Sequence, residues 1–446
     1  MLKLFLWLRY LRKKKIVFLS IAAVALSVSL LIVVASLFTG FIDTFKNTAV
    51  EAIGDVVISP RKCFSKYDQL IESLEQVEMV EAATAKITGY GLLHIGMGNV
   101  RAVEIWGIEP GRRSKVTGFD NFLLDQKNAG NNATFNVPDS PEEIGGFVGI
   151  GVINKPDEQT DEYDLDEAKK VIGQKVILTT GTTSGANDAS LTEIKRKVLN
   201  FTMRDIVETG VYQFDTACIY LSIEQLSKTL YPNEELPVAD QINIKLAENT
   251  DPEVALAVIR GVWRNFVEEQ LDTDLDLIQF TSIETAQEIQ SQYIAAYIQQ
   301  MNVLLVIFGI VSFGVVLLVF CIFYLIVRLK QKDIAIVKSC GAASSSVAGV
   351  FIGFGACVGV VGSGIGVALG YIITTNINVI EQWIRVVFDL KLWRSSVYMF
   401  SRIPDKVNWS WALCIVLTAI IAATIGSLIP AVLAAITKPV EILRYE

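Results

Sequence analysis

Few residue patterns in this chain could carry out catalysis. The 446 residues contain neither a GxxxxGK[ST] phosphate-binding loop nor a GxSxG turn, so the common ATPase and hydrolase motifs are missing. His94 is the only histidine, and a Ser/His/Asp arrangement would therefore have a single candidate base. Its strand-like surroundings, GLLHIG, favour a structural role. We predict that the chain is not an enzyme and has no catalytic residues.

The cysteines and glycines do not predict a ligand site either. No CxxC and no histidine cluster occurs, so we expect neither a metal nor a cofactor. GSGIGVALG at 362–370 is similar to a dinucleotide-binding loop, but it lies inside an apolar run and not between a strand and a helix. Cys63 and Cys218 lie in the large polar segment, which leaves one disulfide open. The other cysteines lie in or beside apolar runs, where each is typical of a small apolar residue: Cys321, Cys340, Cys357 and Cys414.

The pattern with the clearest functional content is a short basic segment, RLKQKDIAIVKSCGA, between two long apolar runs. Ile334, Ile336 and Val337 lie among charged residues there, a mixture typical of a short amphipathic helix. Such a helix at a membrane surface would contact lipid or a partner protein. A solvated turn that only satisfies the charge rule for membrane topology explains the composition equally well.

Four charge-free runs are long enough to cross the roughly 30 Å hydrocarbon core of a bilayer as helices. The composition agrees, with 52% hydrophobic residues and a mean hydropathy of +0.44. The first run is too long for the apolar part of a signal peptide. We predict transmembrane helices at 16–40, 301–327, 347–375 and 409–433.

Lys and Arg residues orient these helices. Six of them and no acidic residue precede the first run, which predicts a cytoplasmic N-terminus. The basic segment at 328–346 then also falls in the cytoplasm, as does the tail at 434–446, while residues 41–300 and 376–408 lie outside. Residues 1–15 place apolar and basic side chains as in an interfacial helix. A simple basic and aromatic anchor is the alternative for this leader.

The pattern of predicted helices and strands in the external segment is typical of an α+β domain. Residues 41–300 hold 22 Lys and Arg against 41 Asp and Glu, which argues against nucleic acid as a partner. Loops rich in Gly, Asn, Asp and Pro at 112–200 indicate a second lobe inserted into a first lobe formed by 41–111 and 201–295. Alternating apolar residues predict separate strands at Val80 to Ile87 and Gly91 to Ile95, among others. Ser282 to Gln300 is predicted to be a helix that runs into the second span.

Glycines in the third span recur at helical spacing. Small residues every four positions let helices approach backbone to backbone within a membrane. The predicted packing positions are Gly355, Gly359, Gly362, Gly366 and Gly370.

The layout of one span, a large external domain and three further spans resembles ABC transporter permeases of the MacB and FtsX type. Within that superfamily the chain is similar to the lipoprotein-releasing permeases of the LolC/LolE type. The segments that carry the resemblance are RYLRKKK, VASLFTGF, GVYQFDTACIYLSIEQL, KQKDIAIVKSCGA and IPAVLAAITKPVEILRYE. They come from all parts of the chain.

The resemblance implies a permease in the bacterial inner membrane, with both termini cytoplasmic and a periplasmic domain of porter-like and sabre-like lobes. It implies these partners: two copies of a separate ATPase subunit, a second permease protomer of the same or a homologous chain, lipoprotein cargo, and a periplasmic carrier. The segment 328–346 would be the coupling element, through Lys330, Lys332, Asp333, Ile334, Ile336, Lys338 and Gly341. Apolar residues at the outer ends of the first two spans would line a cargo cavity: Phe38, Phe41, Phe45, Met301 and Leu305. Ordinary lipid contact or helix packing is the alternative for each of these.

The sequence departs from the family at two points. The acidic and paired-Arg character before the Ile-Ala-Ile stretch is reduced to Lys332 and Asp333. Residues 184–197, where a LolC-type chain carries a Pro- and Arg-containing hairpin for its carrier, contain no proline. Two other functions remain open: a mechanotransmission permease for efflux or cell-wall hydrolase regulation, and a membrane-anchored scaffold without an ATPase.

Overall fold

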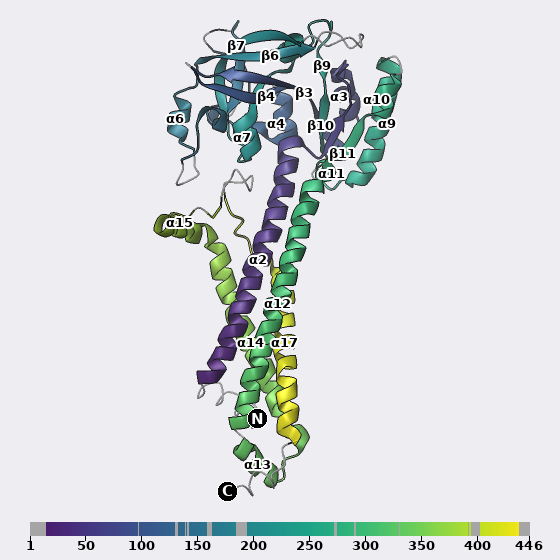
Figure 1. Ribbon diagram of the computed structural model, residues 1–446. Coiled ribbons are helices and arrows are strands. Elements are labelled where there is room, and N and C mark those ends of the chain that lie inside the picture. The colour runs from purple at the N-terminus through teal and green to yellow at the C-terminus, as the bar shows by residue number, and fades with distance from the viewer. Residues whose placement is uncertain are drawn as a thin grey trace. The chain divides into compact units, whose positions relative to one another are not determined.

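The computed structural model describes residues 15–96, 98–129, 133–138, 140, 142–157, 163–183, 194–271, 274–289, 291–329, 331–390, 392–393 and 402–436. It divides into two compact units (Figure 1). The helical unit contains residues 1–43, 294–384 and 403–446, and the sheet unit contains residues 44–293 and 385–402. The predicted leader helix and most of the predicted tail lie outside the described residues.

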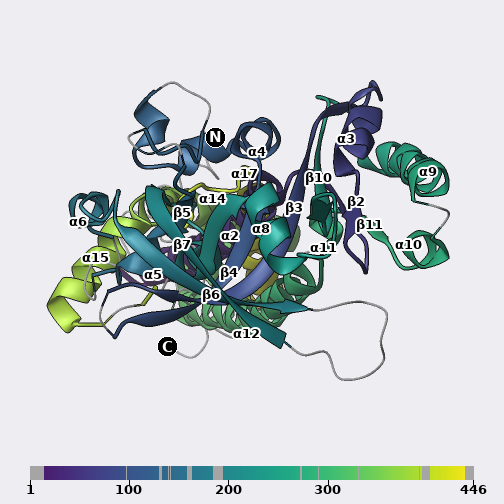
Figure 2. The ribbon, with the colours of Figure 1, turned by 90° about the horizontal axis from the view of Figure 1, so that it is seen from above.

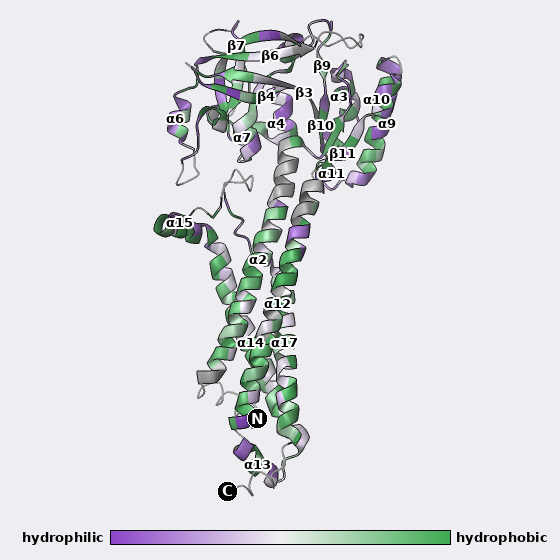
Figure 3. Cartoon of the chain, in the orientation of Figure 1, coloured by the Kyte–Doolittle hydropathy of each residue, from purple (hydrophilic) through white to green (hydrophobic). Residues whose placement is uncertain are grey.

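Long apolar helices make up the helical unit. α2 (Lys15–Ile53), α14 (Ser344–Thr375) and α17 (Trp409–Ile436) each contain a stretch long and apolar enough to cross a membrane. α12 (Ser291–Leu329) is 39 residues long, and its described apolar parts are Ile298–Ile307 and Val316–Leu329. Green, apolar residues dominate all four helices in Figure 3. The chain is therefore a membrane protein, and the count of four spans stays a prediction.

Glycines set the distance between α14 and its neighbours. A Cβ added at Gly359 would lie 3.0 Å from Cα of Ile420 on α17. A Cβ at Gly366 would lie 2.7 Å from Cβ of Val28 and 2.8 Å from the carbonyl oxygen of Ala25, both on α2. These separations leave no room for a larger side chain. The predicted packing positions therefore face helices of the same chain: Gly355 and Gly359 face α17, and Gly362, Gly366 and Gly370 face α2.

Branched and aromatic side chains fill the remaining space in the helical unit. Phe323 of α12 and Phe354 of α14 meet edge to face, with ring centroids 5.5 Å apart. They belong to one buried cluster with side chains of α2 such as Val28, which is 1% exposed. Edge-to-face rings contribute beyond their buried area. α2, α12 and α14 are thus joined in a common apolar core.

The sheet unit is built on nine strands in the order β11-β1-β10-β3-β4-β8-β5-β7-β6, with β3 also pairing with β6. Most neighbours are antiparallel, but β4 with β8 and β5 with β7 are parallel. β2 (Phe64–Ser65) and β9 (Val238–Ala239) form a separate pair. The nine strands are β1 (Val56–Ser59), β3 (Val80–His94), β4 (Val100–Ile108), β5 (Gly145–Gly149), β6 (Lys175–Thr183), β7 (Ile194–Val207), β8 (Cys218–Ser222), β10 (Gln241–Leu246) and β11 (Ser282–Thr285).

Helices complete the sheet unit and bury one end of the sheet. α3 (Tyr67–Glu75) and α9 (Pro252–Gln270) lie side by side (Figure 1 and Figure 2). Trp263 of α9 meets Phe64 edge to face at 5.1 Å, within the main apolar core. The shorter helices are α4 (Pro110–Thr117), α5 (Ile150–Ile153), α6 (Leu165–Lys169), α7 (Tyr212–Ala217), α8 (Ile223–Leu230), α10 (Leu275–Gln279) and α11 (Ala286–Ile289).

The two segments that continue into α2 and α12 leave the sheet from neighbouring strands. β1 follows α2, β11 precedes α11 and α12, and these strands pair from Val56 with Thr285 to Ser59 with Ser282. Asp55 fixes the junction, because its carboxylate accepts from the Leu246 amide at 2.8 Å and its carbonyl accepts from the Ala286 amide at 2.9 Å. The sheet therefore holds both connections at one edge.

A buried polar pair adds to this junction. The side-chain amide of Asn243 on β10 donates to the carbonyl of Ile53 at 2.7 Å and accepts from the Arg113 guanidinium at 3.1 Å. Arg113 is 2% exposed, and burial lowers its pKa to about 10. Its guanidinium also lies 5.5 Å from the ring centroid of Trp106. The end of α2 is thus tied through β10 to α4.

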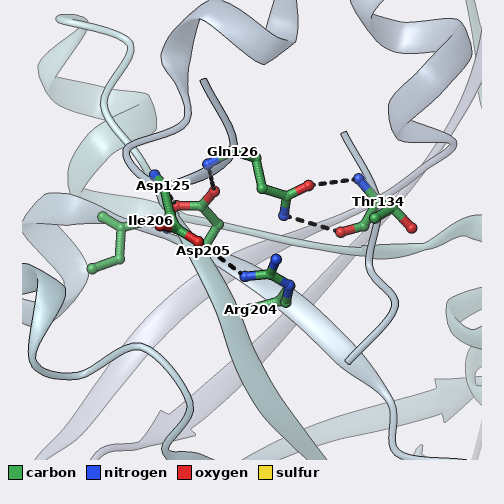
Figure 4. Close-up of polar contacts among 6 residues, drawn as sticks. All are labelled: Asp125, Gln126, Thr134, Arg204, Asp205 and Ile206. Atoms are coloured by element: carbon green, nitrogen blue, oxygen red, sulfur yellow. Dashed lines mark hydrogen bonds and ion pairs between the residues drawn. The ribbon is translucent and has the colours of Figure 1, made fainter. Parts of the chain in front are cut away.

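Buried carboxylates hold two loops of the sheet unit. Asp205 on β7 accepts from the amides of Asp125 at 3.0 Å and Gln126 at 2.8 Å, and the Gln126 side chain in turn pairs with the backbone of Thr134 (Figure 4). Burial raises the pKa of Asp205, although these bonds oppose the shift. Asp215 plays the same part for the turn at Thr209 and Gly210, accepting from both amides at 2.7 and 3.0 Å. Burial raises the pKa of Asp215 to about 6.

Several local predictions from the sequence are wrong. Ser282 to Thr285 is a strand and not the start of a helix, because Ile283 is needed opposite Ile58 in the sheet. Val80–His94 is one 15-residue strand, because Gly89 and Gly91 continue the ladder to β4 instead of breaking it. α14 ends at Thr375, and α15 (Ile377–Phe388) follows in the connection 376–408, whose extracytoplasmic position stays a prediction. The strands assigned to the inserted lobe share one sheet with the rest, so the two-lobe division stays a prediction.

The glycine contacts predict an asymmetric response to alanine. Gly366→Ala should lower the stability of the purified protein by about 1–3 kcal/mol, because its Cβ has no space against α2. Gly364→Ala is the matched control, since nothing lies within 4 Å of a Cβ at that position. Thermal unfolding in detergent measures both. Equal midpoints for the two variants would show that α14 does not pack on α2 through this face.

The pKa of Asp215 predicts a pH effect. Its carboxyl binds a proton more tightly in the folded than in the unfolded protein, so this group stabilises the fold as pH falls towards 4 and loses that contribution as pH rises through 6. The full effect is about 3 kcal/mol. Asp215→Asn should therefore flatten the change in unfolding midpoint between pH 7.5 and pH 5. An unchanged pH profile in the variant would contradict the assignment.

Candidate functional site

An apolar cavity of about 150 Å³ lies within the helical unit, between α2, α12 and α17. A cavity of this size with apolar walls binds apolar ligands in preference to water. A second cavity of about 120 Å³ shares Leu31, Ile415 and Thr418 with the first and extends along the same three helices. The first is lined by Leu31, Val34, Ala35, Phe38, Thr39, Met301, Leu304, Leu305, Trp411, Cys414, Ile415 and Thr418.

The two hydroxyls on the cavity wall are directed to their own helices. Thr39 donates to the carbonyl of Ala35 at 2.8 Å, and Thr418 donates to the carbonyl of Cys414 at 3.0 Å. A threonine in a helix commonly satisfies its hydroxyl in this way. Apart from the Trp411 indole and the Cys414 thiol, the wall therefore offers methyl, methylene and aromatic groups, which suit a hydrocarbon chain.

Three of the five predicted cavity residues line this cavity: Phe38, Met301 and Leu305. Phe41 is buried at 6% exposure but is not among the lining residues. Phe45 lies in α2, and the structure does not describe its side chain. Sequence reasoning missed the α17 wall, because Trp411, Cys414 and Thr418 look like ordinary residues of a membrane helix. The cargo role of these residues stays a prediction.

The basic segment contains a helix, α13 (Gln331–Ser339). Ile334 and Ala335 are buried, and Ile334 packs in a cluster with Val327, Val347 and Ala434. Ile336 and Val337, by contrast, are 53% and 52% exposed. One face of α13 is thus attached to the helical unit, and the other presents two apolar side chains outward.

A lysine attaches α13 to the end of α17. The Lys338 ammonium donates to the carbonyl of Ala435 at 2.7 Å, in the last turn of α17, where free carbonyls favour a cation. Gly341, with φ of +94°, then ends the segment in a conformation that favours glycine. The sequence marked Lys338 and Gly341 only as members of a basic loop. Of the other predicted coupling residues, Lys332 is exposed, the side chain of Asp333 is not described, and Lys330 lies outside the described residues.

The histidine and the two cysteines of the sheet unit, which the sequence raised as candidates for catalysis or a disulfide, lie among ordinary polar contacts of the fold. His94 ends β3, where its imidazole lies 3.2 Å from the Thr179 hydroxyl. Cys63 and Cys218 are both free, and the Cys63 thiol donates to the Tyr231 hydroxyl at 3.1 Å. Among the described residues, no group of three or more His, Cys, Asp or Glu side chains could hold a metal.

Residues 305–439 match the family model described as "FtsX-like permease C-terminal". This stretch contains α13, α14 and α17 and most of α12. The chain is also 25% identical to a protein of Neisseria meningitidis, "Lipoprotein-releasing system transmembrane protein LolC", over 100% of this chain and 99% of that one. These two matches identify the chain as an FtsX-like permease that is similar to LolC.

Two other similarities are partial. A LolC protein of Xylella fastidiosa is 34% identical over 117 residues, which are 26% of the permease described here and 28% of its relative. The structure aligns with the periplasmic region of MacB from Actinobacillus actinomycetemcomitans over 55% of this chain and 95% of that one. The identity is 12% and the TM-score is 0.32. The last similarity is too low to bear on the fold. The match to the FtsX-like family model and the similarity to the LolC proteins confirm the family resemblance seen in the sequence.

Proposed function

We propose that this permease is the membrane subunit of an ABC transporter that extracts lipoproteins from the inner membrane for transfer towards the outer membrane. The observation that carries the proposal is the apolar cavity between α2, α12 and α17, whose wall hydroxyls are satisfied by backbone. The acyl chains of a lipoprotein need an apolar site that opens from the bilayer. The LolC relatives are named for lipoprotein release.

The proposed topology places both termini and α13 in the cytoplasm and the sheet unit in the periplasm. Its support is the excess of Lys and Arg before α2 and between α12 and α14. The domain limits predicted from the sequence belong to this proposal. So does a second permease protomer, which the family resemblance implies. Recruitment of a periplasmic carrier stays a prediction, since residues 184–193 lie outside the described residues.

We infer that the ATPase partner binds the outward face of α13. Ile336 and Val337 are large apolar side chains exposed beside Lys332, and such a patch with a charged rim is typical of a protein interface. The inward face supports the inference, because Ile334 and Lys338 hold α13 against α17. A push on α13 would therefore be passed to α17.

A second function, mechanotransmission without cargo in the membrane, is favoured by a different observation. The connections to α2 and α12 leave the sheet from paired strands β1 and β11. A sheet held in this way would respond to movement of both helices together. The two functions differ in whether lipoprotein occupies the cavity.

Photocrosslinking distinguishes them. A photoreactive amino acid at Leu305, which lines the cavity, should capture lipoprotein in cells, and the captured amount should fall when the ATPase is active. The same amino acid at Ile310 is the control, since that residue is on α12, 67% exposed and away from the cavity. Mass spectrometry identifies the captured protein. Equal capture of bulk lipid at both positions, with no lipoprotein at Leu305, would favour mechanotransmission.

The coupling role of α13 predicts the effect of a charge on its outward face. Ile336→Asp should cost about 3 kcal/mol of association with the ATPase subunit, because an unpaired carboxylate would be buried in the contact. The variant should still fold, since Ile336 is half exposed in the permease alone.

Two further variants serve as controls. Ile336→Leu should keep the partner, and Ile334→Asp should fail to fold because Ile334 is 7% exposed. Copurification of the ATPase subunit with Ile336→Asp and with Ile336→Leu measures the association. Full retention of the partner by Ile336→Asp would move the coupling site away from α13.

A further inference from the structure

The helix α15 begins where α14 ends. α14 stops at Asn376, whose side chain donates to the carbonyl of Ile372 at 2.8 Å and so occupies a carbonyl of the last turn. Ile377 starts the next helix at once, and Figure 1 shows α15 turned away from the line of α14. Because α14 is long and apolar enough to span the bilayer, α15 starts at the level of a membrane boundary.

Aromatic residues mark the same level. Tyr371 in the last turns of α14 stacks on Trp409 at the start of α17, with ring centroids 6.0 Å apart. They are 47% and 60% exposed, and tyrosine and tryptophan gather at the interface between acyl chains and headgroups. The first turn of α15 is fixed to the segment that precedes α17, since the Asn378 side chain pairs with both backbone groups of Ile403 at 3.0 Å.

α15 exposes apolar side chains and buries a charged one, the opposite of a surface helix on a soluble protein. Val379, Trp383, Val386 and Val387 share one face and are 64%, 61%, 79% and 53% exposed. Glu381, which is 5% exposed, is the one buried residue of the helix, and Arg385 is half-buried. A helix that turns charge inward and apolar residues outward is suited to an apolar surrounding medium. Green dominates α15 in Figure 3 accordingly.

We propose that α15 is an interfacial helix that inserts Val379, Trp383, Val386 and Val387 into the lipid leaflet at which α14 ends. The occupant of the apolar face is the acyl-chain and headgroup boundary of the membrane. Direct continuity with a spanning helix and the neighbouring Tyr371 and Trp409 select lipid over a soluble partner. Lipid contact there would hold the segment between α14 and α17 at the membrane surface. The proposal does not depend on the cargo of the permease.

Depth-dependent quenching tests it. The full chain is reconstituted in vesicles of phosphatidylethanolamine and phosphatidylglycerol, with an environment-sensitive fluorescent amino acid in place of Val386. Its emission should be quenched more strongly by a nitroxide high on the acyl chain than by one near the chain end, and iodide in the buffer should have little effect.

Two matched positions calibrate the measurement. The same amino acid at Ile421, 57% exposed in the middle of α17, should be quenched best by the deep nitroxide, and at Asp405, exposed before α17, by iodide alone. Strong iodide quenching at position 386 would overturn the proposal. So would protection from both lipid and iodide quenchers, because a second protomer would then cover the face.

Discussion

Close contact between α14 and its neighbours is the constraint on which the helical unit depends. In a bilayer the hydrophobic effect does not drive helices together, because lipid tails are as apolar as the helix surfaces. Helix association therefore depends on close van der Waals packing. The glycines on one face of α14 allow this close packing against two helices. Gly355 and Gly359 contact α17, and Gly362, Gly366 and Gly370 contact α2. The cavities between α2, α12 and α17 lie in the same unit as these contacts.

The sheet unit has its own organising contact, the pairing of β1 with β11. Asp55 and Asn243 satisfy the polar groups at the turn from α2 into β1, and Arg113 is buried behind them. Removing any one of these groups would leave a buried polar partner unsatisfied, which costs free energy of folding. The connections to α2 and α12 are therefore held at one edge of one sheet.

Within the helical unit, α17 joins the two candidate sites. Its first half supplies Trp411, Cys414 and Thr418 to the cavity, and its last turn accepts the Lys338 bond from α13. Between them Pro430 removes the hydrogen bond that the Gly426 carbonyl would otherwise accept. A helix with one missing bond bends there at low cost. This suits a proposal in which force applied at α13 changes the cavity along a single helix.

The sequence by itself determined the apolar helices, the basic segment with a helical pattern, the glycine positions and most strands, because each depends on local composition and period. It also carried the family resemblance. Only the tertiary structure decided which helix each glycine meets, that Ile334 faces inward and Ile336 outward, and that Ser282–Thr285 is a strand. These depend on partners distant in sequence: a four-residue segment with one apolar residue becomes a strand only when β1 offers an edge, and a helix face is buried only when another helix covers it.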